Sequence, residues 1–195
     1  MDFILHKPAA ASRVCCGHYI ELFEECTEFH CDGQFINTDG ERIVDPRVKK
    51  CKEIFLDQYR FFQPIESCMT ESILEYRKKY SSVDLVATWG IDPVFKVQKY
   101  LPNEGYFKTH CENGGFEDSN RILAWMIYLN DVYDDGYTVF PNQEKKFQPR
   151  TGDLLVWPAH FTHPHHGVTS KTETKYILTG WFTYTKGDHP WDKVS

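Results

Sequence analysis

The sequence lacks the patterns that mark membrane and disulfide-stabilised proteins. In its 195 residues, no apolar run approaches the roughly 18 residues that a membrane-spanning helix needs. The first residues, Met1 to His6, hold too few apolar side chains for the core of a signal peptide, so we expect none. The seven cysteines are odd in number and include no Cys-x-x-Cys pair. This argues against a disulfide framework or a zinc knuckle and favours free thiols in a reducing, cytoplasmic compartment.

Runs of basic residues are also missing. The chain carries 22 Lys and Arg against 28 Asp and Glu, a formal net charge of −6. This argues against a dedicated nucleic-acid binder and leaves only a local basic channel open. Hydrophobic residues make up 41% and aromatic residues 15%, which is enough for a sizeable core and excludes global disorder. The length and the lack of internal repeats predict a single domain over residues 1–195.

The first half of the chain, residues 1–92, is predicted to be mainly helical and to support the rest. Ser12 is a candidate N-cap for a first helix, and residues 64–80 have apolar side chains at near-helical spacing with basic residues in the last turn. Between these helices, residues 32–46 are rich in Gly and Asp and hold two short apolar pairs. We interpret this segment as a hairpin or mobile loop and expect it to act as a flap over a substrate.

The second half, residues 93–185, has the texture of a β-sheet, and the tail 186–195 is expected to be poorly ordered. Short strand-like segments alternate with turn signals, which predicts a sandwich or barrel and therefore a mainly β fold with helical support. The predicted strands are 94–101, 105–112, 121–130, 137–140, 153–157 and 175–185.

Two clusters carry the residue types of a metal site. In a strand, side chains alternate between faces, so His110 and Glu112 would project to the same side and Cys111 to the other. One imidazole and one carboxylate are two ligands of the two-His-one-carboxylate set of non-haem Fe(II) oxygenases. Four histidines then occur within seven residues from His160 to His166, and one of them would complete the set. Zinc is also compatible with such ligands.

The last predicted strand places a lysine among apolar side chains. Lys175, Ile177, Thr179, Trp181 and Thr183 alternate along it and would share one face. A lysine facing into a barrel is costly unless it pairs with an anion, although at the mouth of a strand it would reach solvent.

Taken in order along the chain, these pieces resemble the Fe(II)/2-oxoglutarate-dependent dioxygenases, specifically the prolyl-4-hydroxylase-like family and its compact bacterial or phage members. The resemblance covers residues 97–184 and departs from the family pattern at Glu112, where Asp is usual, and at Asp135, where Gly is usual. The matching segments are Tyr100, Phe107 to Glu112, Arg121 to Asn130, Asp135 to Phe140, Pro149 to Trp157 and Lys175 to Trp181.

The resemblance implies a double-stranded β-helix, or jelly roll, preceded by N-terminal helices. It implies Fe(II) on His110, Glu112 and a distal histidine about ten positions before the basic residue, which favours His165 and leaves His166 as the alternative. His163 would share a face with His165 in an extended segment and line the pocket instead.

The cosubstrate 2-oxoglutarate is implied to bind through Lys175 and Tyr128, with Tyr100 and Thr179 as further donors and Trp181 in the wall. The implied reaction consumes 2-oxoglutarate and O2, yields succinate and CO2, and hydroxylates a C–H bond, with ascorbate as a reductant. The implied partner is a peptide or protein substrate carrying a residue such as proline.

Two other readings stay open at this point. A cupin-like barrel with zinc or another ion would explain the ligands but not Lys175 and Tyr128 at their spacing. A non-catalytic binding module that has lost activity would explain the fold but not a complete ligand set.

Overall fold

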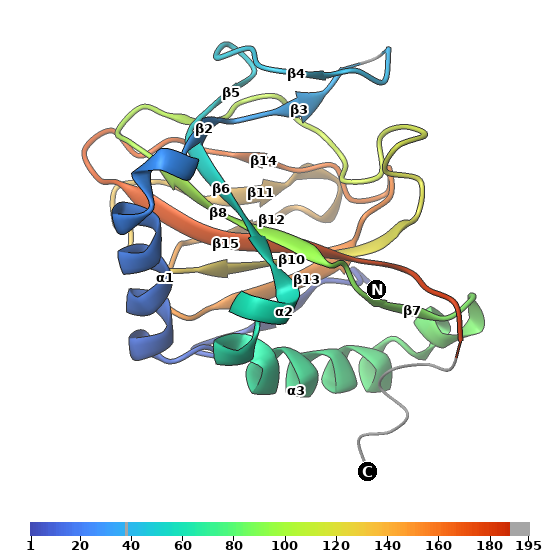
Figure 1. Cartoon of the computed structure of the whole chain (residues 1–195). Helices are drawn as coiled ribbons and strands as arrows, with labels where there is room; N and C mark the ends of the chain where they lie inside the picture. The colour runs from blue at the N-terminus through green and yellow to red at the C-terminus, as the bar shows by residue number, and fades with distance from the viewer. Residues whose placement is uncertain (38, 188–195) are drawn as a thin grey trace.

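A large antiparallel sheet forms the centre of the molecule in the computed structural model, which describes residues 1–37 and 39–187 (Figure 1). Its strands follow the order β1-β13-β10-β15-β8-β6-β2, and β7 also pairs with β15. Each pairing is antiparallel. The strands are β1 (Leu5–Lys7), β2 (Cys31–Asp32), β6 (Lys52–Asp57), β7 (Trp89–Ile91), β8 (Val94–Tyr100), β10 (Arg121–Tyr128), β13 (Leu154–Pro158) and β15 (Lys175–Tyr184).

Shorter strands form three small sheets beside the large one. The three-stranded sheet has the order β12-β11-β14, with β12 (Lys145–Phe147), β11 (Thr138–Phe140) and β14 (His166–Gly167). A hairpin joins β3 (Phe35–Ile36) to β4 (Arg42–Ile43), and β5 (Lys49–Lys50) pairs with β9 (Gly105–Tyr106). The expected hairpin within residues 32–46 is therefore present.

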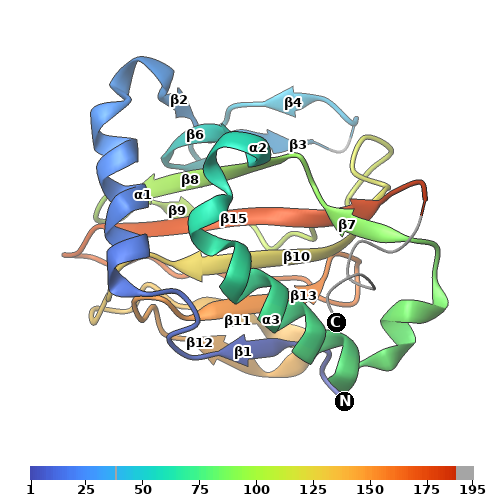
Figure 2. The same cartoon turned by 60° about the horizontal axis from the view of Figure 1, so that its bottom comes forward.

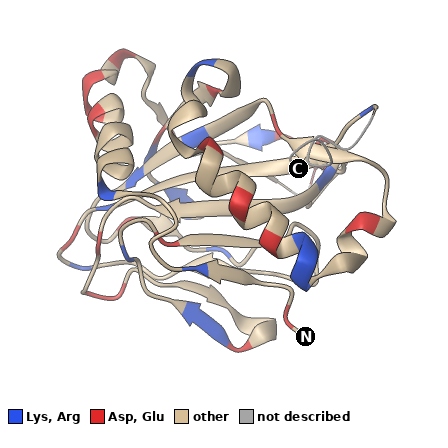
Figure 3. Ribbon diagram, turned by 90° about the horizontal axis from the view of Figure 1, so that it is seen from below, with Lys and Arg blue, Asp and Glu red and all other residues tan. Residues whose placement is uncertain are grey.

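Helices pack on the face of the large sheet that is turned away from the small sheets (Figure 2). They are α1 (Arg13–Glu25), α2 (Gln58–Phe61) and α3 (Gln63–Lys79), and the 3-10 turns η1 (Thr27–Phe29) and η2 (Ser81–Leu85) follow α1 and α3. A third 3-10 turn, η3 (Pro141–Gln143), connects β11 to β12 in the three-stranded sheet. The Ser12 side chain caps α1 by accepting from the Cys15 N–H, as predicted. The last turn of α3 is basic, which suits the negative end of its dipole (Figure 3). Within the described residues, no helix combines the length and the apolar character of a membrane span.

The alternation of side chains along the central strands gives the sheet two different faces. In β10, Trp125 and Ile127 belong to the core beneath α1 and α3, whereas Ala124, Met126 and Tyr128 belong to the core on the opposite face. The second core includes residues of the three-stranded sheet, so the large sheet separates a helical layer from a layer that leaves room for a site.

The predicted strands 94–101, 121–130, 137–140, 153–157 and 175–185 are confirmed to within two residues, as is the helix predicted at 64–80. The strand predicted at 105–112 is wrong. Only Gly105–Tyr106 pairs as a strand there, and His110 forms an isolated bridge with His165. In the described part of the chain, residues 111–120 after that bridge have no ladder partner, and pairing resumes at β10.

The prediction that residues 1–92 are mainly helical is wrong in part. Strands β1 and β6 from this half join the large sheet, so the expected boundary near residue 93 does not divide helix from sheet. Both strands lack an alternating apolar pattern, since β1 is three residues long and β6 has charged residues at both ends. The predicted disorder of the tail lies outside the described residues from position 188 onward. All seven cysteines are free thiols.

Gly152 fixes the turn that enters β13, and its replacement gives a first prediction. Its φ of +85° lies in the left-handed region, and a Cβ there would overlap the Ala11 carbonyl oxygen. We expect Gly152→Ala to lower the free energy of unfolding by about 2 kcal/mol or more, measured by denaturant titration. Gly17→Ala in α1 is the control, since a Cβ there meets no atom within 4 Å and should raise stability by roughly 0.5–1 kcal/mol. Equal stabilities for the two variants would contradict this role of Gly152.

Candidate metal and cosubstrate site

Two histidines far apart in the sequence are held together by their backbones. The His110 N–H donates to the His165 carbonyl at 3.0 Å, and the His165 N–H donates to the His110 carbonyl at 2.9 Å. This is a hydrogen-bonded antiparallel pair, a geometry that places both side chains on the same side of the bridge. The bridge joins the loop after β9 to the residue that precedes β14.

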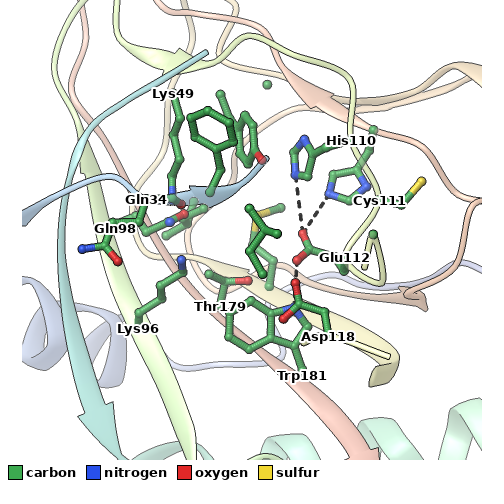
Figure 4. A pocket seen from close by; sticks show the side chains of 18 of the residues that line it. Gln34, Lys49, Lys96, Gln98, His110, Cys111, Glu112, Asp118, Thr179 and Trp181 are labelled. Carbon is green, nitrogen blue, oxygen red and sulfur yellow. Dashed lines mark hydrogen bonds and ion pairs between the residues drawn. The ribbon is translucent and has the colours of Figure 1, made fainter. Parts of the chain in front are cut away.

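Glu112 completes a cluster of three potential ligands with these histidines (Figure 4). Its Oε1 atom lies 3.1 Å from His165 Nε2 and 3.6 Å from His110 Nε2, and the three ligand atoms all lie within 4.8 Å of one another. The Nδ1 atom of His110 bonds the Lys108 carbonyl at 2.9 Å, and that of His165 bonds the His163 carbonyl at 3.1 Å. A carbonyl can only accept, so each Nδ1 carries the proton and each Nε2 keeps a lone pair for a metal.

The second oxygen of Glu112 is occupied by the last strand. The indole N–H of Trp181 donates to Glu112 Oε2 at 2.8 Å, which leaves Oε1 for the metal. Arg121 lies over the Trp181 ring at 3.7 Å from its centroid and donates to the Glu112 backbone carbonyl at 3.0 Å. Trp181 therefore orients a potential metal ligand, in addition to lining the pocket as predicted.

Burial and mutual contacts shift the pKa values of His110 and Glu112. Burial lowers the pKa of His110, and the neighbouring His165 lowers it further, so the imidazole is neutral and ready to coordinate. Burial alone would raise the pKa of Glu112, but the two histidines beside it outweigh burial and hold the pKa well below its usual range. The site thus presents a neutral His110 imidazole and an ionised Glu112 carboxylate at neutral pH.

This donor set fits Fe(II). Two imidazole nitrogens and one carboxylate oxygen on one side of a cavity leave further coordination positions open, as in the facial triad of non-haem iron enzymes. The tautomers are set by backbone carbonyls, and the carboxylate is oriented by Trp181, which supplies the outer contacts that metal ligands require.

A cavity of about 580 Å³ opens beside the triad, and Lys175 lies in its wall. Lys175 is only 6% exposed, and its Nζ donates to the Gly136 carbonyl at 3.0 Å while facing the Tyr100 ring at 5.1 Å. Within residues 1–37 and 39–187 it has no acidic partner. Burial lowers its pKa to about 8. A buried ammonium without a counter-charge is costly, so this position is suited to an anionic ligand.

The other predicted cosubstrate residues lie around Lys175 at different depths. Tyr100 and Thr179 line the cavity, but the Tyr100 hydroxyl donates to Gln98 at 2.9 Å and that of Thr179 to the Trp125 carbonyl at 2.9 Å. Tyr128 is fully buried and does not line the cavity, and its hydroxyl donates to Thr138 Oγ1 at 2.7 Å. Thr138, which lies in the segment Asp135 to Phe140, lines the cavity in place of Tyr128.

The other histidines of the cluster point elsewhere. His166, the alternative to His165, lies with Nδ1 3.2 Å from the Thr109 hydroxyl and lines the rim of the cavity without joining the triad. The expectation that His163 lines the pocket is wrong, because its Nε2 bonds the Asp2 carbonyl at 2.7 Å away from the cavity. The residues brought together are therefore His110, Glu112 and His165.

Sequence reasoning missed a buried polar network on the far wall of the cavity. Glu53 of β6 lies among Lys49, Lys96 and Gln98, and the last three line the cavity (Figure 4). A signal was present in β8, where Lys96, Gln98 and Tyr100 alternate with Phe95 and Val97. The partner carboxylate is 43 residues upstream of Lys96, in a segment whose sequence does not alternate as a half-buried strand does.

Comparison with known proteins agrees with this geometry. Residues 95–183 match the family model described as the 2OG-Fe(II) oxygenase superfamily. A curated protein from Acanthamoeba polyphaga mimivirus, "Putative prolyl 4-hydroxylase", is 35% identical over 108 residues. That match covers 47% of this chain and 45% of the viral protein, so it spans less than half of the relative. The predicted resemblance to the 2-oxoglutarate dioxygenases is confirmed over the matched residues.

Solved structures share the fold across nearly the whole chain. A viral collagen prolyl hydroxylase from Paramecium Bursaria Chlorella virus-1 gives a TM-score of 0.67 at 14% identity, covering 94% of this chain and 97% of the other. A Pseudomonas putida prolyl-4-hydroxylase gives 0.67 at 16%, covering 95% of each. A Trichoplax adhaerens prolyl hydroxylase, solved with a peptide fragment of hypoxia inducible factor, gives 0.70 at 16%, covering 94% and 84%. At such identities the likeness shows the fold, and the predicted jelly roll with helical support is confirmed.

The placement of the triad predicts which histidine is indispensable for metal binding. We expect His165→Ala to weaken Co(II) binding by more than about a hundredfold, followed by the visible absorption of the ion, because one of three ligands is lost. His166→Ala and His163→Ala are the controls and should bind Co(II) as the wild type does. Loss of binding in His166→Ala with retention in His165→Ala would contradict the assignment.

Proposed function

We propose that the protein is a Fe(II)- and 2-oxoglutarate-dependent dioxygenase that hydroxylates a C–H bond, with a peptidyl residue such as proline as its substrate. The observation that carries the proposal is Lys175, a buried cation without an acidic partner in the same cavity as the triad. A metal barrel with another chemistry has no need of such a cation, whereas the dicarboxylate 2-oxoglutarate does.

The residues present would hold both the metal and the cosubstrate. His110, Glu112 and His165 would bind Fe(II), which when bound supplies the activation of O2, the conversion of 2-oxoglutarate to succinate and CO2, and the oxidation of the C–H bond. Lys175 would bind the far carboxylate of 2-oxoglutarate as an ammonium. Thr138 lines the same cavity, and its hydroxyl accepts from Tyr128, so its own proton is left to donate to the carboxylate. The Tyr100 hydroxyl would donate to the carboxylate by exchanging its bond to Gln98.

The surroundings of the site limit access of water. Ile177, Met126 and Trp157 line the cavity with apolar surface, and Trp181 covers one side of the carboxylate ligand. A dry wall strengthens the charge interaction at Lys175 and protects reactive species from side reactions. The chain thus supplies binding, orientation and exclusion of water, while the bound metal supplies the redox chemistry.

The choice of a prolyl substrate is supported by the relatives. The mimivirus protein carries prolyl 4-hydroxylase in its name, and the Trichoplax adhaerens enzyme was solved with a peptide fragment. Ascorbate as a reductant stays a prediction. A reducing, cytoplasmic location is part of the proposal and is supported by seven free thiols.

One reaction tests the proposed function. The protein is incubated in air with Fe(II), 2-oxoglutarate and a library of proline-containing peptides, and succinate and oxidised peptides are measured by mass spectrometry. We expect succinate and peptides heavier by one oxygen atom, both absent when Fe(II) is replaced by Zn(II). Absence of 2-oxoglutarate binding to the Mn(II)-loaded protein would favour the cupin-like barrel, and binding without any succinate would favour the non-catalytic module.

The proposed ion pair between Lys175 and 2-oxoglutarate predicts how the affinity for 2-oxoglutarate changes on substitution and with pH. Lys175→Met should raise the Kd about a hundredfold or more, since breaking a buried charge pair costs roughly 3–5 kcal/mol, and should leave Mn(II) binding unchanged. In the wild type, burial lowers the Lys175 pKa to about 8, so the binding-competent ammonium is lost as the pH rises through that value.

The Kd measured by calorimetry should therefore rise by up to about tenfold per pH unit above pH 8. In Lys175→Arg the guanidinium stays charged, and the profile should be flat over that range. A flat profile in the wild type, or an unchanged Kd in Lys175→Met, would contradict the assignment.

The β3–β4 hairpin is our candidate for the substrate flap. Phe35, Ile36 and Arg42 line the cavity from the side that the large sheet leaves open. Deleting Asp39 and Gly40 should spare Mn(II) and 2-oxoglutarate binding but uncouple the reaction, so that succinate forms in excess over hydroxylated peptide. A matched deletion of Gly114 and Gly115, in the other loop at the cavity, is the comparison. A hairpin deletion with unaltered coupling and unaltered peptide affinity would show that β3–β4 is only a connection.

A further inference from the structure

A single buried carboxylate organises the wall of the cavity that faces the triad. Glu53 is fully buried, and its Oε2 accepts from Lys49 Nζ at 2.8 Å and from Gln98 Nε2 at 2.7 Å, with Lys96 Nζ at 3.2 Å. Its Oε1 accepts the Gln34 N–H at 3.1 Å. The hydrogen-bonding capacity of Glu53 is thus well used, and Lys49 is further tied to the Gln34 carbonyl at 2.9 Å.

Lys96 is the member of this network whose N–H donors are not all satisfied. It lines the cavity and is 8% exposed, and in the described part of the chain its one ion-pair partner is the Glu53 oxygen that it shares with Lys49 and Gln98. An ammonium group has three N–H donors, so Lys96 has donors left to offer. Its Nζ also lies 5.5 Å from the Trp181 ring centroid. Burial and the charge of Lys49 lower its pKa to about 8 although Glu53 opposes this.

The charges of the network do not cancel. Two ammonium groups share one carboxylate, which leaves one positive charge in the cavity wall. In the proposed function, the two charges of 2-oxoglutarate and that of Glu112 already balance Fe(II) and Lys175. The neighbouring Arg121 is paired with Asp118 at 2.8 Å. Asp92 also lines the cavity, but its side chain accepts the Val94 N–H at 2.9 Å and its charge interacts with Arg121. In the described part of the chain, Glu53 is therefore the one carboxylate within ion-pair distance of Lys96, and a buried ammonium that shares its only counter-ion is costly.

We propose that Lys96 binds a carboxylate of the substrate that is hydroxylated, with Lys49 and Glu53 as positioning residues. This inference rests on the proposed function and names the substrate class, a substrate with a carboxylate close to the carbon that is oxidised. Lys96 and the triad lie on opposite sides of the cavity, with Thr179 and Trp181 between them (Figure 4). Trp181 contacts both, since its ring faces Lys96 while its N–H holds Glu112.

This carboxylate has two sources that share the same chemistry. It is either the side chain of an acidic residue next to the proline in a peptide or the main-chain carboxylate of a free amino acid. Matched pairs of probes separate them. The peptide pairs are acetyl-Gly-Pro-Glu-amide with acetyl-Gly-Pro-Gln-amide, and acetyl-Glu-Pro-Gly-amide with acetyl-Gln-Pro-Gly-amide. The amino-acid pair is L-proline with L-prolinamide.

The experiment measures the affinity of each probe for protein loaded with Mn(II) and 2-oxoglutarate under nitrogen, by calorimetry. For at least one pair, we expect the wild type to bind the carboxylate about tenfold to a hundredfold more tightly than the amide, as for a hydrogen bond to a charged group. Lys96→Met should abolish this preference without changing the affinity for the amide. Lys96→Arg should retain part of the preference because the charge is kept.

Lys99→Met is the matched control. Lys99 lies on the same strand with its side chain on the other face, where it pairs with Glu24 at 2.7 Å, so its loss should leave the preference intact. Lys96→Met is expected to fold, since Glu53 keeps Lys49 and Gln98, and thermal unfolding checks this.

Equal affinities of carboxylate and amide for the wild type in every pair, or an equal loss of both in Lys96→Met, would overturn the proposal. Failure of the proposed function would look different, because the wild type would then not bind Mn(II) and 2-oxoglutarate together. In that case, the same titrations of the protein without Mn(II) and 2-oxoglutarate still decide whether Lys96 selects a carboxylate.

Discussion

The site depends on the pair of backbone hydrogen bonds between His110 and His165. Neither residue lies inside a long strand, so these two bonds fix the separation of the imidazoles and the direction of both side chains. The bonds of Nδ1 to the Lys108 and His163 carbonyls then fix the rings and their tautomers. Because backbone atoms set this geometry, we expect metal affinity to depend little on the side chains of the flanking loop residues. It remains sensitive to any change that alters how β9 and β14 approach each other.

Much of the fold and most of the site were predictable because β10, β13 and β15 combine strand-forming side chains with clear turn signals at their ends. The period of two in β15 placed Lys175 and Trp181 on one face, and the structure agrees. The choice of His165 over His166 came from spacing along the chain, which family resemblance supplies and elementary chemistry does not.

The parts that escaped prediction are those in which tertiary contacts override local patterns. Residues 105–112 look like a strand, yet only Gly105–Tyr106 finds a partner before the chain turns. The sequence of β6 does not show the alternation of a half-buried strand, because the charged residue Glu53 is buried against other polar side chains instead of facing solvent. The role of Lys96 could not be predicted for the same reason. Its carboxylate partner, Glu53, is brought close only by the pairing of β6 with β8. Buried charge networks between distant strands leave little trace in a single sequence.

Trp181 joins two tasks in one side chain. Its indole N–H holds the oxygen of Glu112 that faces away from the histidines, and its ring lies against the cations of Lys96 and Arg121. Substitutions in this wall therefore should not act independently. A change at Lys96 that shifts the indole also shifts a metal ligand, so its effect combines non-additively with changes at Glu112. Substitutions near Trp181 that change the substrate would accordingly also affect metal binding. Substitutions in the β3–β4 hairpin are freer to change the substrate, because the hairpin shares no contact with Trp181 among the described interactions.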